Sequence, residues 1–328
     1  MHTLSAGSAT ELFTAACRCL RTHGSAVAPR GLATTELLGT HLHLTRPRYR
    51  FVDEAPARVI NAAFAAAEAV WILSGSDEPW IFDFNKRLRR FTDHGRLQGA
   101  YGPRLRNWQG RDQLDTVRRV LEDDDQSRQA VIQLFNPARD FSGHRDVPCT
   151  LGYRFYIRSG RLVMFTTMRS QDTWLGFPYD IFTTTLLQEL LAGWLGVGLG
   201  EYHHLVDSLH LYDDHLALAE TLDTLPVGHQ AEAGAQLDLR VPWEDFDTLL
   251  AQITAGELVG HAGWDDFAIV LASYRRWKAG DRDNARALLT GSDQLLSAAL
   301  RRWYELLESE PHRIASAPAT PNARGRLA

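Results

Sequence analysis

The sequence predicts a protein of the α/β class, in its α+β form, with a helical extension at its C-terminal end. Strand-like and helix-like segments alternate up to residue 241, whereas later segments have the apolar period of helices. We expect a main region over 1–241, an extension over 242–310 packed on the same body, and a disordered tail over 311–328. The tail is rich in Pro, Ala, Arg and Ser, which disfavours a packed core.

Helices are predicted where the apolar pattern repeats every turn and a cap or stop signal marks an end. Ser8 and Glu11 form a capping-box pattern that opens a helix running to residue 21. Gly75 stops an amphipathic helix over 57–73, and Pro178 suits the first turn of a helix that continues to residue 194. Further helices are predicted at 112–122, 243–255, 264–279, 284–289 and 293–308.

Strands are predicted where β-branched and apolar residues are concentrated or alternate with polar ones. Residues 152–157 and 162–167 alternate on either side of Ser159 and Gly160, which indicates a hairpin with a short turn. The remaining extended segments are 34–44, 129–135 and 203–212, and the expected loops are 24–30 and 76–108.

Composition excludes several classes of protein. The formal net charge of −5 argues against a broad basic face for nucleic acid, and no apolar run is long enough to span a bilayer. No export signal is visible, and three cysteines are too few for a disulfide framework. We therefore expect a cytoplasmic protein with reduced thiols and no metal site, in which Cys17 and Cys19 are packing residues.

Two residues are candidates for chemistry. Cys149 follows Pro148 and precedes the predicted hairpin, and arginines sharing its pocket would lower its pKa and supply a thiolate nucleophile. Glu68 lies on the apolar stripe of its helix, so it has either a partner or a raised pKa suited to proton transfer. Simple packing of the thiol and a structural ion pair of the glutamate are the alternatives.

Other polar residues suit a phosphorylated sugar. Guanidinium groups bind phosphate oxygens bidentately and a hydroxyl adds a donor. His210 and Tyr212 are two apart on an extended segment, so both tips face one side and can bind a ligand hydroxyl. The phosphate candidates are Arg30, Arg128, Arg169 and Ser170.

Taken in order, these motifs resemble the thymidylate synthase family, over residues 29–216. The segment from Arg169 to Asp180, RSQDTWLGFPYD, is similar to the family motif RSxDxFLGLPFN. The other matches are Glu68 to Gly75 with ELLWFLxG, Gly99 to Gly102 with GPVYG, Ser127 to Asn136 with the Ser-Arg-Arg strand, Pro148-Cys149 with the Pro-Cys nucleophile, and His210 to Tyr212 with HxY.

The resemblance implies a mixed sheet flanked by helices, which pairs through a sheet face into a homodimer. It also implies that the Cys149 thiolate adds to C6 of a pyrimidine nucleotide, after which C5 captures the one-carbon unit of 5,10-methylenetetrahydrofolate. Glu68, with Tyr101 and ordered water, would move protons on the base and the cosubstrate.

The resemblance also implies binding roles. Arg30, Arg169 and Ser170 would hold the 5′-phosphate, with Arg128 reaching in from the partner subunit. His210 and Tyr212 would hold the 3′-hydroxyl of the sugar. The residues that would face the folate are Phe82, Asp172, Leu175, Gly176 and Tyr179.

One departure from the family concerns the base. Asp180 stands where the family has an asparagine that matches uracil. A carboxyl group can accept from N4 of cytosine and share a proton with N3, whereas facing O4 of uracil it would place two acceptors together. The same replacement distinguishes the phage-type dCMP hydroxymethylases and the CMP hydroxymethylases. A bare preference for an acid at a helix N-terminus is the alternative.

Further departures concern the product and the phosphate. Phe82 takes the place of a tryptophan that packs on the folate, and the segments after residue 241 do not resemble the synthase closing tail. Both changes would let water reach the methylene group, which predicts a hydroxymethyl product. Gln129 replaces the second arginine and Thr150 replaces a histidine. The choice between CMP and dCMP therefore stays open.

We expect a (deoxy)cytidylate 5-hydroxymethyltransferase. The alternatives are a thymidylate synthase acting on dUMP, a cytidylate C5-methyltransferase with the same site, and a catalytically inactive nucleotide-binding homologue.

Overall fold

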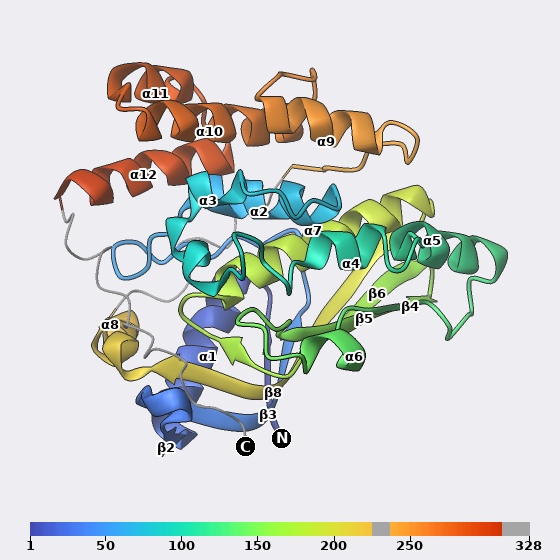
Figure 1. Ribbon diagram of the computed structural model, residues 1–328, viewed down its shortest axis with the longest axis horizontal. Helices are drawn as coiled ribbons and strands as arrows, with labels where there is room; N and C mark the ends of the chain where they lie inside the picture. Colours follow the sequence, from blue (N-terminus) through green and yellow to red (C-terminus); the bar gives the residue numbers. More distant parts are fainter. Residues whose placement is uncertain (225–236, 310–328) are drawn as a thin grey trace.

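The computed structural model describes residues 1–224 and 237–309, so the predicted tail at 311–328 lies outside the described residues. Within them, one mixed sheet has the strand order β1-β3-β8-β6-β5-β4, with β2 paired to β3 and β7 to β8 (Figure 1). This confirms the predicted class. The strands are β1 (His2–Ala6), β2 (Ser25–Val27), β3 (Thr34–Leu44), β4 (Val131–Gln133), β5 (Thr150–Arg158), β6 (Arg161–Met168), β7 (Gln171–Asp172) and β8 (Gly198–Tyr212).

The two long strands β3 and β8 form the centre of the sheet. They are antiparallel, from the pair Thr34 and Tyr212 to the pair Leu44 and Tyr202, and β6 lies parallel to β8 on its other side. The predicted hairpin is confirmed as β5 and β6. Its turn residues Ser159 and Gly160 both have positive φ, as the common two-residue hairpin turn requires.

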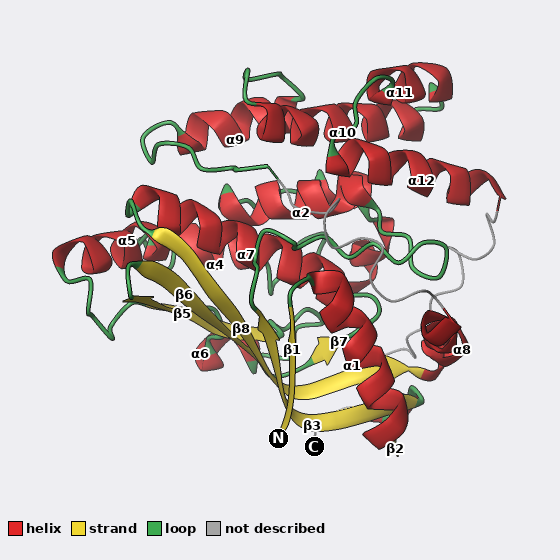
Figure 2. Cartoon of the chain, turned by 180° about the vertical axis from the view of Figure 1, so that it is seen from behind, coloured by secondary structure: helices red, strands yellow, loops and turns green. Residues whose placement is uncertain are grey.

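Helices cover one face of the sheet in successive layers (Figures 1 and 2). The long helix α7 contacts β6 and β8, α2 packs on α7, and the C-terminal helices α10 and α12 pack on α2. The helices are α1 (Ala9–His23), α2 (Ala62–Leu73), α3 (Ile81–Phe84), α4 (Tyr101–Arg106), α5 (Gln113–Asp123), α6 (Pro137–Asp140), α7 (Phe177–Trp194), α8 (Leu216–Thr221), α9 (Phe246–Ala255), α10 (Ala262–Lys278), α11 (Arg282–Leu289) and α12 (Leu295–Ser309).

The position of α2 explains its composition. It lies between α7 and the C-terminal helices, and every residue of it except Glu68 is buried. A helix that is apolar on all sides is typical of a core position. The described part of the C-terminal extension therefore covers the helix that carries Glu68.

Several element boundaries differ from the prediction. Helix α2 begins at residue 62 rather than 57, because the Asn61 side chain caps it by accepting from the Phe64 N–H at 3.2 Å. Strand β8 begins at 198 rather than 203, because its first residues pair with β6. Strand β4 is limited to the three residues that pair with β5, and the expected loops contain β2, α3 and α4. None of the described helices is long and apolar enough to cross a membrane.

Candidate active site

Cys149 lies where β5 begins, beside the end of β6. The pairing of Thr150 with Met168 brings the next residue, Arg169, against it, and the Arg169 N–H donates to the Cys149 carbonyl at 2.9 Å. The Arg169 guanidinium donates to the Pro148 carbonyl at 2.9 Å and lies 3.6 Å from Cys149 Sγ. The hairpin register thus places a fixed cation on the candidate nucleophile.

The pKa of the Cys149 thiol corrects one expectation. Burial raises it, as do the carboxylates of Asp180 and Asp146, while Arg169 and Arg30 lower it. The net direction is upward, because loss of hydration outweighs the two arginines. This direction is opposite to the one predicted from the arginines alone.

Strand β7 joins the phosphate and sugar candidates. It pairs Asp172 with His210, which places Ser170 Oγ 3.5 Å from His210 Nδ1. The His210 and Tyr212 rings meet edge to face at 5.3 Å. The Arg30 guanidinium acts to lower the pKa of the Tyr212 hydroxyl, and Arg30 itself has a left-handed backbone (φ 56°). Arg30, Arg169 and Tyr212 each interact electrostatically with Cys149, and Ser170 and His210 contact one another.

Glu68 and Tyr101 approach from α2 and α4. The first turn of α4 lies against the segment that follows α2: a Cβ on Gly102 would lie 2.4 Å from the Ser76 carbonyl oxygen. The Tyr101 hydroxyl accepts from the Thr150 N–H at 3.1 Å, next to Cys149. Burial and then the Asp180 carboxylate raise the pKa of Glu68 to about 8. Glu68 is therefore an acid at neutral pH that can exchange protons.

Replacing Glu68 with glutamine should lower turnover by about 10²–10³-fold, because the amide keeps the shape but cannot exchange a proton. Since the glutamic acid ionises near pH 8, wild-type turnover should fall as pH rises through 8, and this alkaline limb should vanish in the variant. The measurement is kcat against pH for both proteins, with nucleotide affinity as the control. Full turnover of the variant would remove Glu68 from the chemistry.

Asp180 lies in the first turn of α7 and is half-buried. Gln171 Nε2 donates to Asp180 Oδ2 at 2.8 Å. Burial raises the pKa of Asp180 to about 6, with a smaller upward effect from Asp172, while the Gln171 hydrogen bond lowers it. Asp180 is the carboxyl group that raises the pKa of Glu68, so the two acids face the same space.

The candidate folate residues form two groups. Asp172 Oδ1 accepts from the Trp174 and Leu175 N–H groups at 2.8 and 2.9 Å, which fixes the turn that leads to Gly176 and Tyr179. A half-exposed carboxylate, an apolar side chain and a tyrosine ring suit a planar heterocycle with N–H donors, so this group fits a folate. Phe82 forms the second group by itself. It lies on α3 and is only 4% exposed, and the Arg89 guanidinium lies 4.8 Å above its ring.

The structure leaves Arg128 apart and adds residues that the sequence did not single out. Arg128 is exposed on the segment before the edge strand β4. The residues missed are Gln171, which the family motif treats as variable, its partner His204, and Asp146, which raises the pKa of Cys149. Of these three residues, only Gln171 could have been found from the sequence, because its amide stands inside the matched family motif.

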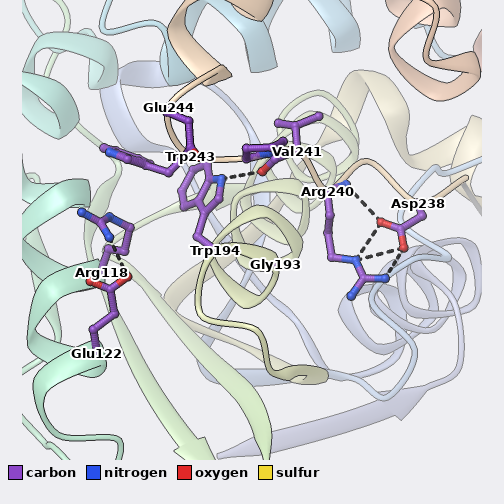
Figure 3. Close-up of a pocket in the computed structure, with 10 residues that line it drawn as sticks. Arg118, Glu122, Gly193, Trp194, Asp238, Arg240, Val241, Trp243 and Glu244 are labelled. Carbon is purple, nitrogen blue, oxygen red and sulfur yellow. Dashed lines mark hydrogen bonds and ion pairs between the residues drawn. The ribbon is translucent and has the colours of Figure 1, made fainter.

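Two further features lie away from this group. His43, Glu201 and His203 have potential metal-ligand atoms within 4.8 Å of one another; His203 is adjacent to His204 on β8 and so points to the opposite sheet face. A pocket of about 580 Å³ lies between α5, the end of α7 and residues 238–244 (Figure 3). Two ion pairs lie in its lining, Arg240 with Asp238 and Arg118 with Glu122.

Comparisons with other proteins identify the family of the chain. A model of the thymidylate synthase family matches residues 13–250. The chain is 33% identical to a deoxyuridylate hydroxymethyltransferase of Bacillus phage SP01 over 265 residues, which are 76% of this chain and 68% of that protein. It is 32% identical to a thymidylate synthase of Listeria monocytogenes over 130 residues, 38% of this chain and 41% of that protein. The chain therefore belongs to the thymidylate synthase family of one-carbon transferases, which use methylenetetrahydrofolate as cosubstrate.

Proposed function

We propose that the protein transfers a hydroxymethyl group to C5 of a cytidine monophosphate, either dCMP or CMP. The observation that carries the proposal is the half-buried Asp180 carboxyl group, with a pKa of about 6, at the position where the family reads the base with an asparagine. A group that gains and loses a proton near neutrality suits cytosine, whose N3 accepts and whose N4 donates.

The residues around Cys149 account for the covalent steps. Cys149 passes its proton to water beside the Arg169 guanidinium, which stabilises the thiolate, and Sγ bonds C6, which makes C5 a nucleophile. When bound, 5,10-methylenetetrahydrofolate supplies the one-carbon unit. C5 would bond to that unit. As C5 then loses its proton, the bond from the unit to tetrahydrofolate would break, tetrahydrofolate would leave, and an exocyclic methylene group would remain on C5. Glu68 and Tyr101 are positioned to relay this proton through water. Water adds to the exocyclic carbon, the bond between Sγ and C6 breaks, and 5-hydroxymethylcytidylate leaves.

A second candidate is hydroxymethylation of dUMP, which the name of the phage relative favours. The two candidates differ only in the base that Asp180 meets. A carboxylate facing O4 of uracil leaves two acceptors unpaired, which costs on the order of 1–3 kcal/mol when buried. The carboxyl group at residue 180 is therefore the reason to place cytidylate first.

Products distinguish the candidates. The purified protein is incubated with methylenetetrahydrofolate and each of CMP, dCMP, UMP and dUMP, and the products are identified by mass. We expect hydroxymethylated cytidylate without stoichiometric dihydrofolate. Hydroxymethyl-dUMP would select the second candidate, and a methylated product with equal dihydrofolate would select a synthase-type reaction.

We also propose a homodimer in which Arg128 reaches the partner's site. The sheet face opposite α7 bears aromatic and apolar side chains that the described helices leave half-exposed: Tyr156, Phe165 and Leu205. Apolar sheet faces of this kind suit pairing with a second copy. An exposed arginine at the edge of that sheet is positioned to cross such an interface.

Subunit mixing tests this arrangement. Arg128→Ala and Cys149→Ser should each be nearly inactive alone. Random mixing makes half of the dimers hybrids, each with one intact site, so about one quarter of wild-type activity should return. The mixture is denatured, refolded together and assayed, with separately refolded variants as the control. No recovery would place Arg128 in its own subunit's site.

A further inference from the structure

We propose that Gln171 is a positioning residue that fixes the Asp180 carboxyl group as an acceptor and thereby selects cytosine over uracil. The inference rests on the proposed function and adds a residue that the family motif leaves variable. It follows from a chain of hydrogen bonds that begins and ends at Asp180.

The Gln171 amide is held at both of its ends. The side chain is 2% exposed on β7. Its Nε2 donates to Asp180 Oδ2 at 2.8 Å, and its Oε1 lies 3.0 Å from His204 Nε2. The reversed amide would put two acceptors together at Asp180. The observed orientation is therefore the one that the Asp180 carboxylate requires, and it leaves Oε1 to accept from the His204 Nε2–H.

His204 donates because the orientation of the Gln171 amide fixes the tautomer of the ring. Burial lowers the pKa of His204 to about 3, so the ring is neutral and carries one N–H. Because Gln171 Nε2 donates to the Asp180 carboxylate, Gln171 Oε1 faces His204 Nε2, so the single ring proton lies on Nε2 and Nδ1 faces the Tyr202 hydroxyl at 2.7 Å. Tyr202 is held in turn by Thr166 at 2.9 Å and by Thr184 at 2.8 Å.

The hydrogen-bond network returns to Asp180 through Thr184. Thr184 Oγ1 also lies 2.7 Å from the Asp180 backbone carbonyl, so α7 and the sheet strands β6 and β8 hold both the backbone and the side chain of Asp180. Gly176 leaves room for this contact: a Cβ there would lie 2.8 Å from Gln171 Nε2 and 3.3 Å from Asp180 Oδ2. Residue 176 thus has a local reason to be glycine.

The bond from Gln171 to Asp180 determines which hydrogen-bonding groups the ligand must supply. With an N–H already on Oδ2, the carboxyl group is stabilised as an acceptor, and the ligand must supply the proton or the N–H. Cytosine does so through N4 and a protonated N3, whereas uracil presents O4. The titratable groups that face Asp180 are Glu68, Tyr101, Cys149, Tyr153, Asp172 and Tyr202. Among the effects on the Asp180 pKa, the bond from Gln171 is the one that lowers it.

The test uses two variants that keep the size of the side chain. Gln171→Met removes the donor, and Gln171→Glu keeps an oxygen for the His204 N–H while placing an acid beside Asp180. We measure kcat/KM against pH for dCMP, CMP and dUMP, and nucleotide binding by calorimetry. Both variants should shift the midpoint of the cytidylate profile upward and reduce the preference for cytidylate over dUMP by about tenfold or more.

A matched control is Gln188→Met, which removes another buried amide of the same size from α7, bonded to the Leu162 and Glu201 carbonyls. It should lower Tm without moving the pH midpoint or the preference. If the Gln171 variants lose activity on all nucleotides equally and keep the wild-type midpoint, Gln171 is merely structural and the inference is wrong. Wild-type protein that prefers dUMP overturns the proposed function instead, and the midpoint shift still reports on Gln171.

Discussion

Replacing Cys149 with serine should lower turnover by at least about 10³-fold and should abolish release of tritium from C5 of the nucleotide. Serine has nearly the same shape, but its hydroxyl is a far weaker nucleophile than a thiolate and cannot form the bond to C6 at a useful rate. Tritium release reports the step that follows that bond, so its loss would place the defect at the covalent step rather than at product release.

The control for this variant is Cys19→Ser, a thiol on α1 outside the site. It should keep wild-type turnover. The Cys149→Ser protein should still bind cytidylate, because Arg169, Ser170 and His210 are unchanged. Full turnover of the Cys149→Ser protein would contradict the covalent mechanism.

Replacing Asp180 with asparagine should reverse the choice of base. The amide keeps an oxygen that accepts from the Gln171 N–H at the position of Oδ2, while its own N–H turns toward the ligand. That N–H suits O4 of uracil and opposes the amine of cytosine. We expect kcat/KM for cytidylate to fall by about 10²–10⁴-fold and kcat/KM for dUMP to rise.

The measurement compares both nucleotides in one competition assay with products identified by mass. Asp283→Asn, the same chemical change at an exposed position on α11, is the control and should leave the preference as it is. An unchanged preference in the Asp180→Asn protein would mean that this carboxyl group does not read the base.

Much of the fold could be predicted because its signals are local. The capping box at Ser8, the hairpin turn at Ser159 and Gly160, and the bounds of β3 depend on neighbouring residues, and all three agree with the structure. The start of α2 was misplaced because the Asn61 cap interrupts an apolar pattern that continues upstream. The first residues of β8 depend on pairing with β6, which no local pattern reveals.

The sequence order predicted that several candidate residues would lie close together, but it did not predict their pKa values. The sequence order of the motifs singled out Cys149, Arg169 and His210, which the structure brings together. The direction of the Cys149 pKa was wrong, because the degree of burial and the nearby Asp146 cannot be read from sequence. The contact between Gln171 and His204 joins different strands, so it too became visible only in three dimensions.

The central claim is that Cys149 bonds a cytosine nucleotide during turnover, and trapping that bond tests it most directly. Turnover requires C5 to lose its hydrogen as a proton, and a fluorine at C5 cannot be lost in this way. A 5-fluorinated substrate should therefore stall after the one-carbon transfer. We expect 5-fluoro-dCMP or 5-fluoro-CMP with methylenetetrahydrofolate to add the mass of nucleotide and cosubstrate to the intact protein, on the peptide containing Cys149. An adduct that forms only with 5-fluoro-dUMP, or that lies on another residue, would contradict the account.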